Sequence, residues 1–203
     1  MARIGILGGT FNPPHNGHLA LAAAAIGQLE LEQLLVIPAK DPPHKEVEAD
    51  PGAETRFGLC EAAFDRIEGV AVSRVEIERE GPSWTADTLV AVAADYPDDD
   101  LILILGEDAA LSLPSWKQPE VVVGLAQVAW VPRGGVDGHE SVEDVVSSLG
   151  GSVTPLRLEM DPLNVSSTEV RERVANGLEL TDLAPLAVAT MISELGLYHR
   201  KSV

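Results

Sequence analysis

The chain is poor in cysteine, in positive charge and in long apolar segments. Its 203 residues include one cysteine, Cys60, so no internal disulfide can form. The lone thiol fits a small buried side chain in a reducing cytoplasm. Lys and Arg number 14 against 32 Asp and Glu, which gives a formal net charge of −18 at pH 7. Without a basic face, such a chain is not expected to bind nucleic acid.

Further absences argue against membrane insertion and against several enzyme classes. The alanine-rich stretch Leu19–Ile26 is too short to cross a bilayer, and no secretion signal is recognisable at the N-terminus. The chain has no G-x-x-x-x-G-K-[ST] of the P-loop NTPases and no G-x-S-x-G of the hydrolases. Gly5, Gly8 and Gly9 do not form the G-x-G-x-x-G of dinucleotide-dependent dehydrogenases. We therefore expect a cytoplasmic protein outside these classes, with no membrane partner.

Short apolar runs alternate with helical stretches, which predicts an α/β fold: a single doubly wound parallel sheet with helices on both faces. Strands are expected at Ile4–Leu7, Leu34–Ile37, Ala71–Val75, Leu101–Leu105 and Val128–Val131. Helices are expected near Gly17–Gln28, Glu54–Ile67, Thr85–Ala94, Thr168–Ala175 and Ala184–Leu195. No linker divides the chain, so residues 1–203 are predicted to form one domain with a helical C-terminal part from about residue 166. The polar segment Arg133–Asp144 is expected to be a surface excursion.

The N-terminal segment carries the most specific chemistry. A short apolar strand ends in Gly8-Gly9, where the backbone can turn and approach a ligand closely. A proline-stiffened loop follows, and then an alanine-rich helix whose positive end attracts anions. His15 and His18 lie three residues apart, so both rings can sit on the same side of that turn. Such a loop can present cationic donors to a phosphate, although a pair of surface histidines or a metal site are alternatives.

This first motif resembles the signature of the HxGH nucleotidyltransferases, on the run Gly8-Gly9-Thr10-Phe11-Asn12-Pro13-Pro14-His15-Asn16-Gly17-His18. Within that superfamily it is similar to the bacterial nicotinate-mononucleotide adenylyltransferases, which have a Rossmann-like nucleotidyltransferase fold. The resemblance implies that His15 and His18 are catalytic, contacting the ATP phosphates and stabilising the transition state.

The middle of the chain extends the resemblance. The family has a loop like Pro42–Lys45 that closes over the mononucleotide, although a solvated lysine is the ordinary reading of Lys45. The turn Gly81–Thr85 precedes a helix that Ser83 or Thr85 can cap, and in the family this turn meets the pyridine ring. Here Trp84 replaces the tyrosine that the family usually has. Trp116 matches the tryptophan that stacks on the ring, with ordinary core packing as the alternative.

Two further segments resemble the ATP side of the family site. Gly106-Glu107-Asp108 follows the strongest predicted strand, and Asp108 matches the family pattern, whereas Glu107 replaces a small residue. Ser166 and Glu169 have the spacing of a capping box, which alone marks a common helix start. Three consecutive hydroxyl side chains together with Arg171 at one helix end also form a phosphate clamp.

The resemblance implies two sets of contacts. ATP is expected to contact Gly8, Gly9, Thr10, Phe11, His15, His18, Gly106, Asp108, Ser166, Ser167, Thr168 and Arg171. The mononucleotide is expected to contact Gly9, Thr10, Asn12, His44, Lys45, Trp84, Thr85, Trp116 and Arg133. No side chain is expected to ligate a metal, and Mg²⁺ is expected to arrive with ATP.

The implied reaction is transfer of the adenylyl group of ATP to nicotinate mononucleotide, in the biosynthesis of NAD. One alternative is a sister adenylyltransferase that uses nicotinamide mononucleotide or phosphopantetheine. A second alternative is a nucleotide-binding sensor without turnover, for which Glu107 leaves room. The sequence leaves the oligomeric state open, a homo-oligomer included.

Overall fold

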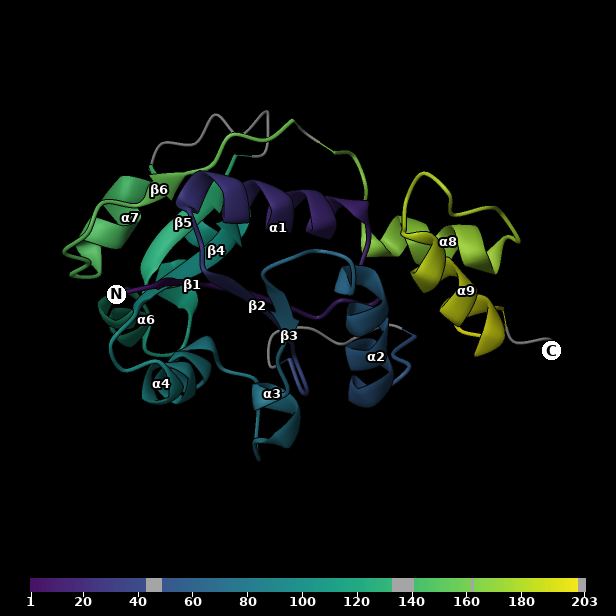
Figure 1. Ribbon diagram of the computed structural model, residues 1–203, viewed down its shortest axis with the longest axis horizontal. Helices are drawn as coiled ribbons and strands as arrows, with labels where there is room; N and C mark the ends of the chain where they lie inside the picture. Colours follow the sequence, from purple (N-terminus) through teal and green to yellow (C-terminus); the bar gives the residue numbers. More distant parts are fainter. Residues whose placement is uncertain (43–48, 133–140, 162, 201–203) are drawn as a thin grey trace.

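The strands of the described residues form one six-stranded parallel sheet. A computed structural model describes residues 1–42, 49–132, 141–161 and 163–200. The strand order is β3-β2-β1-β4-β5-β6, and every neighbouring pair is parallel, which confirms the predicted doubly wound sheet (Figure 1). The strands are β1 (Arg3–Gly9), β2 (Gln33–Pro38), β3 (Val70–Val72), β4 (Asp100–Gly106), β5 (Gln127–Val131) and β6 (Leu156–Arg157).

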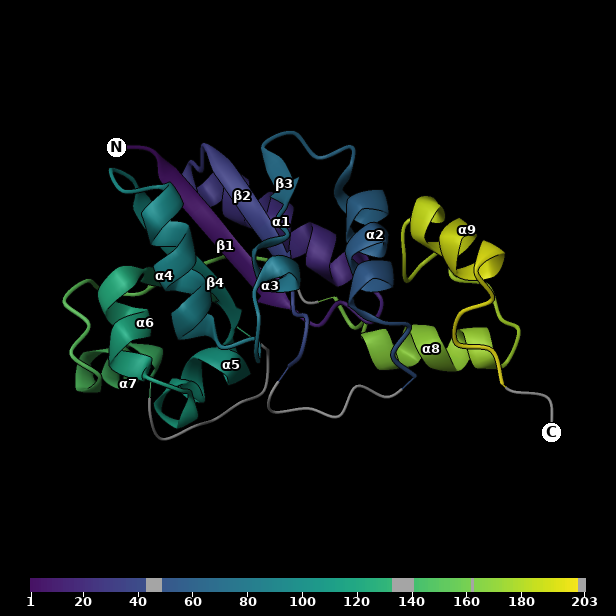
Figure 2. The same ribbon diagram turned by 90° about the horizontal axis from the view of Figure 1, so that it is seen from below.

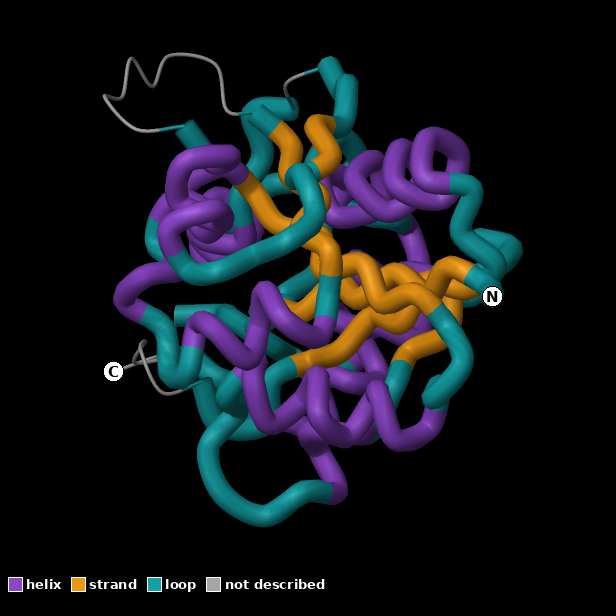
Figure 3. Tube along the Cα trace, turned by 90° about the vertical axis from the view of Figure 1, so that its left-hand side faces the viewer, coloured by secondary structure: helices purple, strands orange, loops and turns teal. Residues whose placement is uncertain are grey.

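Helices cover both faces of the sheet (Figures 1 and 3). One face carries α1 (Asn16–Leu29) and α2 (Ala53–Phe64). The other packs against α4 (Thr85–Asp95), α5 (Glu107–Leu111), α6 (Pro119–Leu125) and α7 (Val142–Ser148). The short α3 (Val75–Glu78) precedes α4, and a 3₁₀ turn, Leu113–Ser115, follows α5. Beyond α2, at the end of the molecule opposite α7, lie α8 (Ser167–Ala175) and α9 (Leu186–Glu194) (Figure 2).

Alternating side chains of the central strands fill two cores. Leu34 and Val36 of β2 enter the core beneath α1 and α2, while Leu35 and Ile37 enter the core beneath α4 and α6. Gly5 of β1 lies beneath Leu31, where a Cβ atom would come within 2.5 Å of the leucine methyl carbon Cδ1. Each face of the sheet is therefore closely packed, as both faces of a parallel sheet must be.

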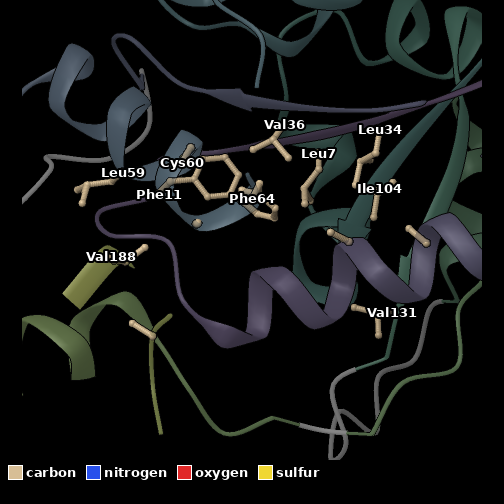
Figure 4. Packing of buried hydrophobic residues seen from close by; sticks show 14 of the residues in the cluster. Leu7, Phe11, Leu34, Val36, Leu59, Cys60, Phe64, Ile104, Val131 and Val188 are labelled. Carbon is tan, nitrogen blue, oxygen red and sulfur yellow. The ribbon is translucent and has the colours of Figure 1, made fainter. Parts of the chain in front are cut away.

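The first core reaches the loop after β1 through Phe11. Its ring is 2% exposed and lies edge-on to Phe64 of α2, with 6.5 Å between the ring centroids. Figure 4 shows both rings beside Cys60 of α2. The thiol is fully buried, as the sequence predicts, and burial raises its pKa far above the ordinary value. The loop that follows β1 is thus anchored in the hydrophobic core.

Several boundaries differ from prediction. The expected strand Ala71–Val75 is wrong in its second half, because β3 ends at Val72 and Val75 begins α3. The expected surface excursion Arg133–Asp144 is wrong at its end, since Val142 is 2% exposed and starts α7. Residues 133–140 of that segment lie outside the described residues. Five further elements, all short, are not among the predicted ones: β6, α3, α5, α6 and α7.

The described ranges contain no helix that is both long and apolar enough to span a bilayer. The cytoplasmic location of the protein stays a prediction. The assignment of residues 1–203 to a single domain also stays a prediction. The C-terminal helices begin with Ser166 as the N-cap of α8.

Candidate active site

The strand order places a crevice at the carboxyl ends of the central strands. Neighbouring chain connections leave in opposite directions from β1 and β4, and in open α/β sheets ligands bind at such a switch point. A cavity of about 470 Å³ lies there. Gly8 and Gly9 of β1, Ile37 of β2 and Leu105 of β4 contribute to its walls. We call this cavity the apolar cavity, because most of its lining is hydrocarbon.

Six of the residues predicted to bind ligand line the apolar cavity: Gly8, Gly9, Thr10, Trp84, Thr85 and Trp116. They come from three separate parts of the sequence, and the fold brings them together. Thr85 is the first residue of α4, where the N–H groups of the opening turn lack partners within the helix. Lys117 also lines the cavity; its Nζ lies 5.4 Å from the Trp84 ring centroid and 3.1 Å from an Asp87 carboxylate oxygen. The cavity thus combines flat apolar walls with polar groups at its edge.

The turn before α4 is built differently from prediction. The N-cap residue of α4 is Trp84, and no side chain caps the helix, so the expected cap by Ser83 or Thr85 is wrong. The Ser83 hydroxyl instead accepts backbone N–H groups from Lys40, at 2.9 Å, and Asp41, at 3.2 Å. Ser83 therefore ties the turn to the segment after β2, across the mouth of the cavity.

The two histidines of the first motif lie in contact at the start of α1. The rings of His15 and His18 are stacked, with 3.7 Å between centroids and 28° between planes. This confirms that both rings lie on one side of the turn. Between them, a side chain on Gly17 would fit tightly: a Cβ atom would lie 3.1 Å from the His15 ring and from a Val165 methyl group. Any larger residue at this position would therefore have to displace the His15 ring or Val165 by a few tenths of an ångström.

His18 is held as a neutral hydrogen-bond donor. The backbone N–H of His15 donates to His18 Nδ1 at 3.1 Å, so the proton of the neutral ring is on Nε2. Burial, together with the neighbouring His15, lowers the pKa of His18 to about 3. The expectation of a cationic donor is therefore wrong for His18 in the free protein. A neutral Nε2–H can still donate to a phosphate oxygen.

The second motif packs against the first. We call residues 10–18 the histidine loop. Ser167 Oγ donates to the Pro13 carbonyl at 2.8 Å, and Arg171 Nη1 donates to the Asn12 carbonyl at 2.9 Å. Ser166 caps α8 by accepting the Glu169 N–H at 3.1 Å, which is half of the predicted capping box, while the Glu169 carboxylate pairs with Arg173 at 3.4 Å. Because the Ser167 hydroxyl proton is engaged by Pro13, the backbone N–H groups of the first turn of α8 are the better donors for an anion.

Other C-terminal segments also fasten the histidine loop. The Asn16 N–H donates to the Leu183 carbonyl at 2.8 Å, and the Asn16 side-chain amide donates to the Asp182 carbonyl at 3.0 Å. The Tyr198 hydroxyl donates to Asn12 Oδ1 at 2.8 Å, and burial raises the pKa of this phenol. The loop is therefore fixed from the C-terminal side at both its start and its end.

Comparison with known proteins agrees with this arrangement. The sequence profile described as cytidylyltransferase-like matches residues 6–173. The chain belongs to the cytidylyltransferase-like family. It is 35% identical to the probable nicotinate-nucleotide adenylyltransferase of Geobacillus thermodenitrificans, over 100% of this chain and 88% of the relative. It is 38% identical to the protein of the same name from Synechococcus sp., over 97% and 94% of the two chains. The predicted resemblance is confirmed.

Solved structures share the fold. The Plasmodium falciparum nicotinic acid mononucleotide adenylyltransferase complexed with APC matches with a TM-score of 0.76, at 16% identity over 98% of both chains. The complex of that protein with NaAD matches with a TM-score of 0.75, also at 16% identity over 98% of both chains. This likeness confirms a Rossmann-like nucleotidyltransferase fold.

The remaining predicted residues of the family site fall into three groups. Gly106 ends β4, and Asp108 is an exposed residue in the first turn of α5, close to Leu105 and Ala109 of the cavity wall. Phe11 is predicted to contact ATP, but its side chain is buried and lies edge-on to His18, at 4.9 Å between centroids. His44, Lys45 and Arg133 lie outside the described residues.

Arg56 is a buried residue of the site that the sequence analysis missed. It lies in α2 with no exposed surface. Its guanidinium donates to the carbonyls of Thr10, at 2.9 Å, of Ala39, and of Lys40, at 3.2 Å. Its Nε donates to Asp50 at 2.9 Å. Arg56 thus joins the histidine loop to the segment after β2 and fixes two edges of the crevice. An isolated arginine in a helix gives no local signal of such a role.

Proposed function

We propose that the chain transfers the adenylyl group of ATP to nicotinate mononucleotide, forming nicotinate adenine dinucleotide and pyrophosphate. One observation supports this above the others: a histidine loop suited to phosphate opens beside an apolar cavity suited to a flat ring. Thr10 belongs to both the histidine loop and the cavity wall, and Gly9 of the wall directly precedes the loop. A substrate that carries a ring at one end and a phosphate at the other fits this arrangement. The names of the relatives at 35% and 38% identity point to the same reaction.

The reaction needs little covalent chemistry from the protein. A phosphate oxygen of the mononucleotide attacks the α-phosphorus of ATP in line, a new P–O bond forms, and pyrophosphate leaves with the electrons of the bond that breaks. Negative charge shifts onto the leaving pyrophosphate and the equatorial oxygens. The protein must align the two phosphates and stabilise this charge.

His18 supplies a fixed donor for that charge. The hydrogen bond from the His15 N–H fixes the orientation of the imidazole before substrate arrives, so no reorganisation is needed during the reaction. The stacked His15 and the edge of Phe11 hold the ring from two further directions. A neutral donor also costs less to bury than an imidazolium would.

The outer phosphates of ATP are assigned to the start of α8. Its first N–H groups, the Thr168 side chain and Arg171 offer donors beside the histidine loop. Across the described residues there is no group of three or more His, Cys, Asp or Glu side chains that could hold a metal ion. In the proposed reaction Mg²⁺ enters as part of the MgATP substrate, ligated by phosphate oxygens and water.

The ring of the mononucleotide is assigned to the apolar cavity. Trp84 and Trp116 provide flat surfaces for stacking. The ring carboxylate is placed at the first turn of α4, where Thr85 and unpartnered N–H groups can donate to it.

The test is pyrophosphate release from MgATP, with nicotinate mononucleotide and nicotinamide mononucleotide offered in parallel. We expect turnover with the acid form and a strong preference for it over the amide. Turnover with the amide alone would reassign the acceptor. Binding of MgATP without pyrophosphate release, by folded protein and with either acceptor, would favour the nucleotide-binding sensor.

A further inference from the structure

Glu76 is a buried acidic residue that the mechanism above does not use. It belongs to α3, its side chain lines the apolar cavity, and it is 7% exposed. One carboxylate oxygen, Oε1, accepts the Thr88 hydroxyl at 2.6 Å. The other, Oε2, is buried and has no hydrogen-bond partner in the described structure. None of the ion pairs formed by the described residues includes Glu76.

Groups of the protein itself compensate the negative charge of the Glu76 carboxylate only weakly. The one hydrogen bond comes from a neutral hydroxyl, which also lies 3.1 Å from the Trp84 carbonyl and accepts from Arg79 at 3.4 Å. The Arg79 guanidinium lies close by but forms no ion pair with Glu76 among the described residues: Nη1 lies 3.6 Å from an Asp87 carboxylate oxygen, and the buried Nε has no hydrogen-bond partner. A buried carboxylate without a cation is costly, and buried polar atoms normally have partners. Glu76 therefore has the properties of a group whose partner is a ligand.

The surroundings of Glu76 restrict what that ligand can be. Trp84 and Trp116 line the cavity, so a flat and largely apolar group is the kind of ligand that can stack there. The opening turn of α4 at Thr85 attracts negative charge, whereas Glu76 contacts Thr88, which lies three residues or roughly 4.5 Å further along the same helix. The cavity thus has the positive end of α4 and the negative Glu76 carboxylate close together. Their separation is similar to that between an aromatic ring and a substituent on it. A flat zwitterion matches this pattern.

We propose that Glu76 is a specificity-determining residue that compensates the positive charge of a pyridinium ring. This inference rests on the proposed function, because the ring nitrogen of nicotinate mononucleotide is bonded to ribose and carries a formal positive charge. The ring carboxylate is held at Thr85, and the cationic ring lies against Glu76 and between the aromatic walls. Glu76 then selects a charged pyridinium over a neutral ring of the same shape.

The test compares two ligands that differ in ring charge alone. One is nicotinate mononucleotide, and the other is its benzoate C-riboside 5′-phosphate analogue, in which carbon replaces the ring nitrogen. Dissociation constants are measured by calorimetry for the wild type and for Glu76→Gln, Glu76→Met and Glu76→Asp. The matched control is Glu78→Gln, which removes an exposed carboxylate from the same helix, one paired with Arg74.

We expect the wild type to bind the pyridinium ligand about tenfold more tightly or better. Glu76→Gln, which keeps an acceptor for Thr88, should lose most of this preference, whereas Glu76→Asp and Glu78→Gln should retain it. The preference is the decisive readout, because a general disturbance of the cavity weakens both ligands equally. If Glu76→Gln fails to fold, Glu76→Met removes the same charge with an apolar side chain of similar length and decides the question.

The possible failures are distinguishable. Equal affinity of the wild type for the two ligands, together with normal turnover, overturns the role of Glu76 and leaves the proposed function standing. An undiminished preference in Glu76→Gln or Glu76→Met does the same. A folded wild type that binds neither ligand overturns both proposals.

Discussion

The histidine loop and the apolar cavity are neighbouring parts of one crevice, yet they are held in different ways. The loop is fixed by directed hydrogen bonds from distant segments, among them those from Ser167, Arg171 and Tyr198. The cavity is formed mainly by packed side chains, and its one buried acid lacks a complete set of partners.

This difference corresponds to the two tasks of the proposed reaction. Phosphoryl chemistry requires donors whose positions are set before charge develops, and a network of hydrogen bonds provides that rigidity. Recognition of a ring requires shape and one or two charges, and these can be left unpaired until the ligand arrives. In the proposed transfer, the rigid histidine loop would therefore serve the chemistry. The apolar cavity, whose buried acid lacks a full set of partners, would select the ring.

The largest expected effect comes from substituting Arg56, the residue that joins both regions. Arg56→Ala removes the donors to Thr10, Ala39 and Lys40 and leaves one buried carbonyl, two half-buried carbonyls and Asp50 without this partner. We expect the free energy of unfolding to fall by about 3–5 kcal/mol, measured by urea denaturation. The control is Arg66→Ala, an exposed residue just after α2, with an expected change within about 0.5 kcal/mol. A loss under about 1 kcal/mol for Arg56→Ala would contradict its joining role.

The next effect tests the rigid end. His18→Ala should lower kcat roughly 10²–10³-fold in the pyrophosphate-release assay, because it removes a preorganised donor. His18→Gln, which keeps a neutral N–H donor, should retain more of the rate than His18→Ala. Circular dichroism serves to confirm that both variants are folded. Near-normal turnover in His18→Ala would remove this residue from the mechanism.

A smaller effect tests the cavity. Trp116→Ala should raise KM for nicotinate mononucleotide about tenfold through loss of stacking, a change of about 1.4 kcal/mol. The KM for ATP and kcat should change much less, since the histidine loop does not depend on this side chain. If Trp116→Ala instead lowered kcat and left KM unchanged, the division of tasks between the two regions would be wrong.

The smallest expected effect concerns pH. The pKa of His18 is lowered to about 3 in the folded protein, against an ordinary value of about 6.5. Between these values the unfolded chain binds a proton that the folded chain does not, so the free energy of unfolding falls as pH falls through this window. His18→Gln should have a shallower pH dependence from pH 6.5 downwards. Equal slopes for variant and wild type would show that His18 titrates normally.

Sequence reasoning succeeded where the information is local. The strands β1, β2, β4 and β5 are apolar runs bounded by turns, and Ser166 caps α8 because its spacing to Glu169 is a local pattern. The stacking of the two histidines likewise follows from their separation by three residues.

It failed where partners are distant. Arg56 donates to carbonyls 17 and 46 positions earlier in the chain. No pattern in the neighbouring sequence predicts these hydrogen bonds. Ser83 has a hydroxyl that could cap a helix. That hydroxyl instead accepts hydrogen bonds from backbone N–H groups about 40 positions earlier in the chain. The lowered pKa of His18 depends on burial, which a sequence motif does not report.

The bond between Tyr198 and Asn12 joins residues 186 positions apart. The bond between Ser167 and Pro13 spans 154 positions, and every strand of the sheet lies within or before that span. During synthesis on the ribosome, a nascent chain can therefore pair all its strands while the first motif still lacks its C-terminal supports. Competence for the reaction would be acquired late, at the moment when α8 and the segment up to Tyr198 emerge and dock.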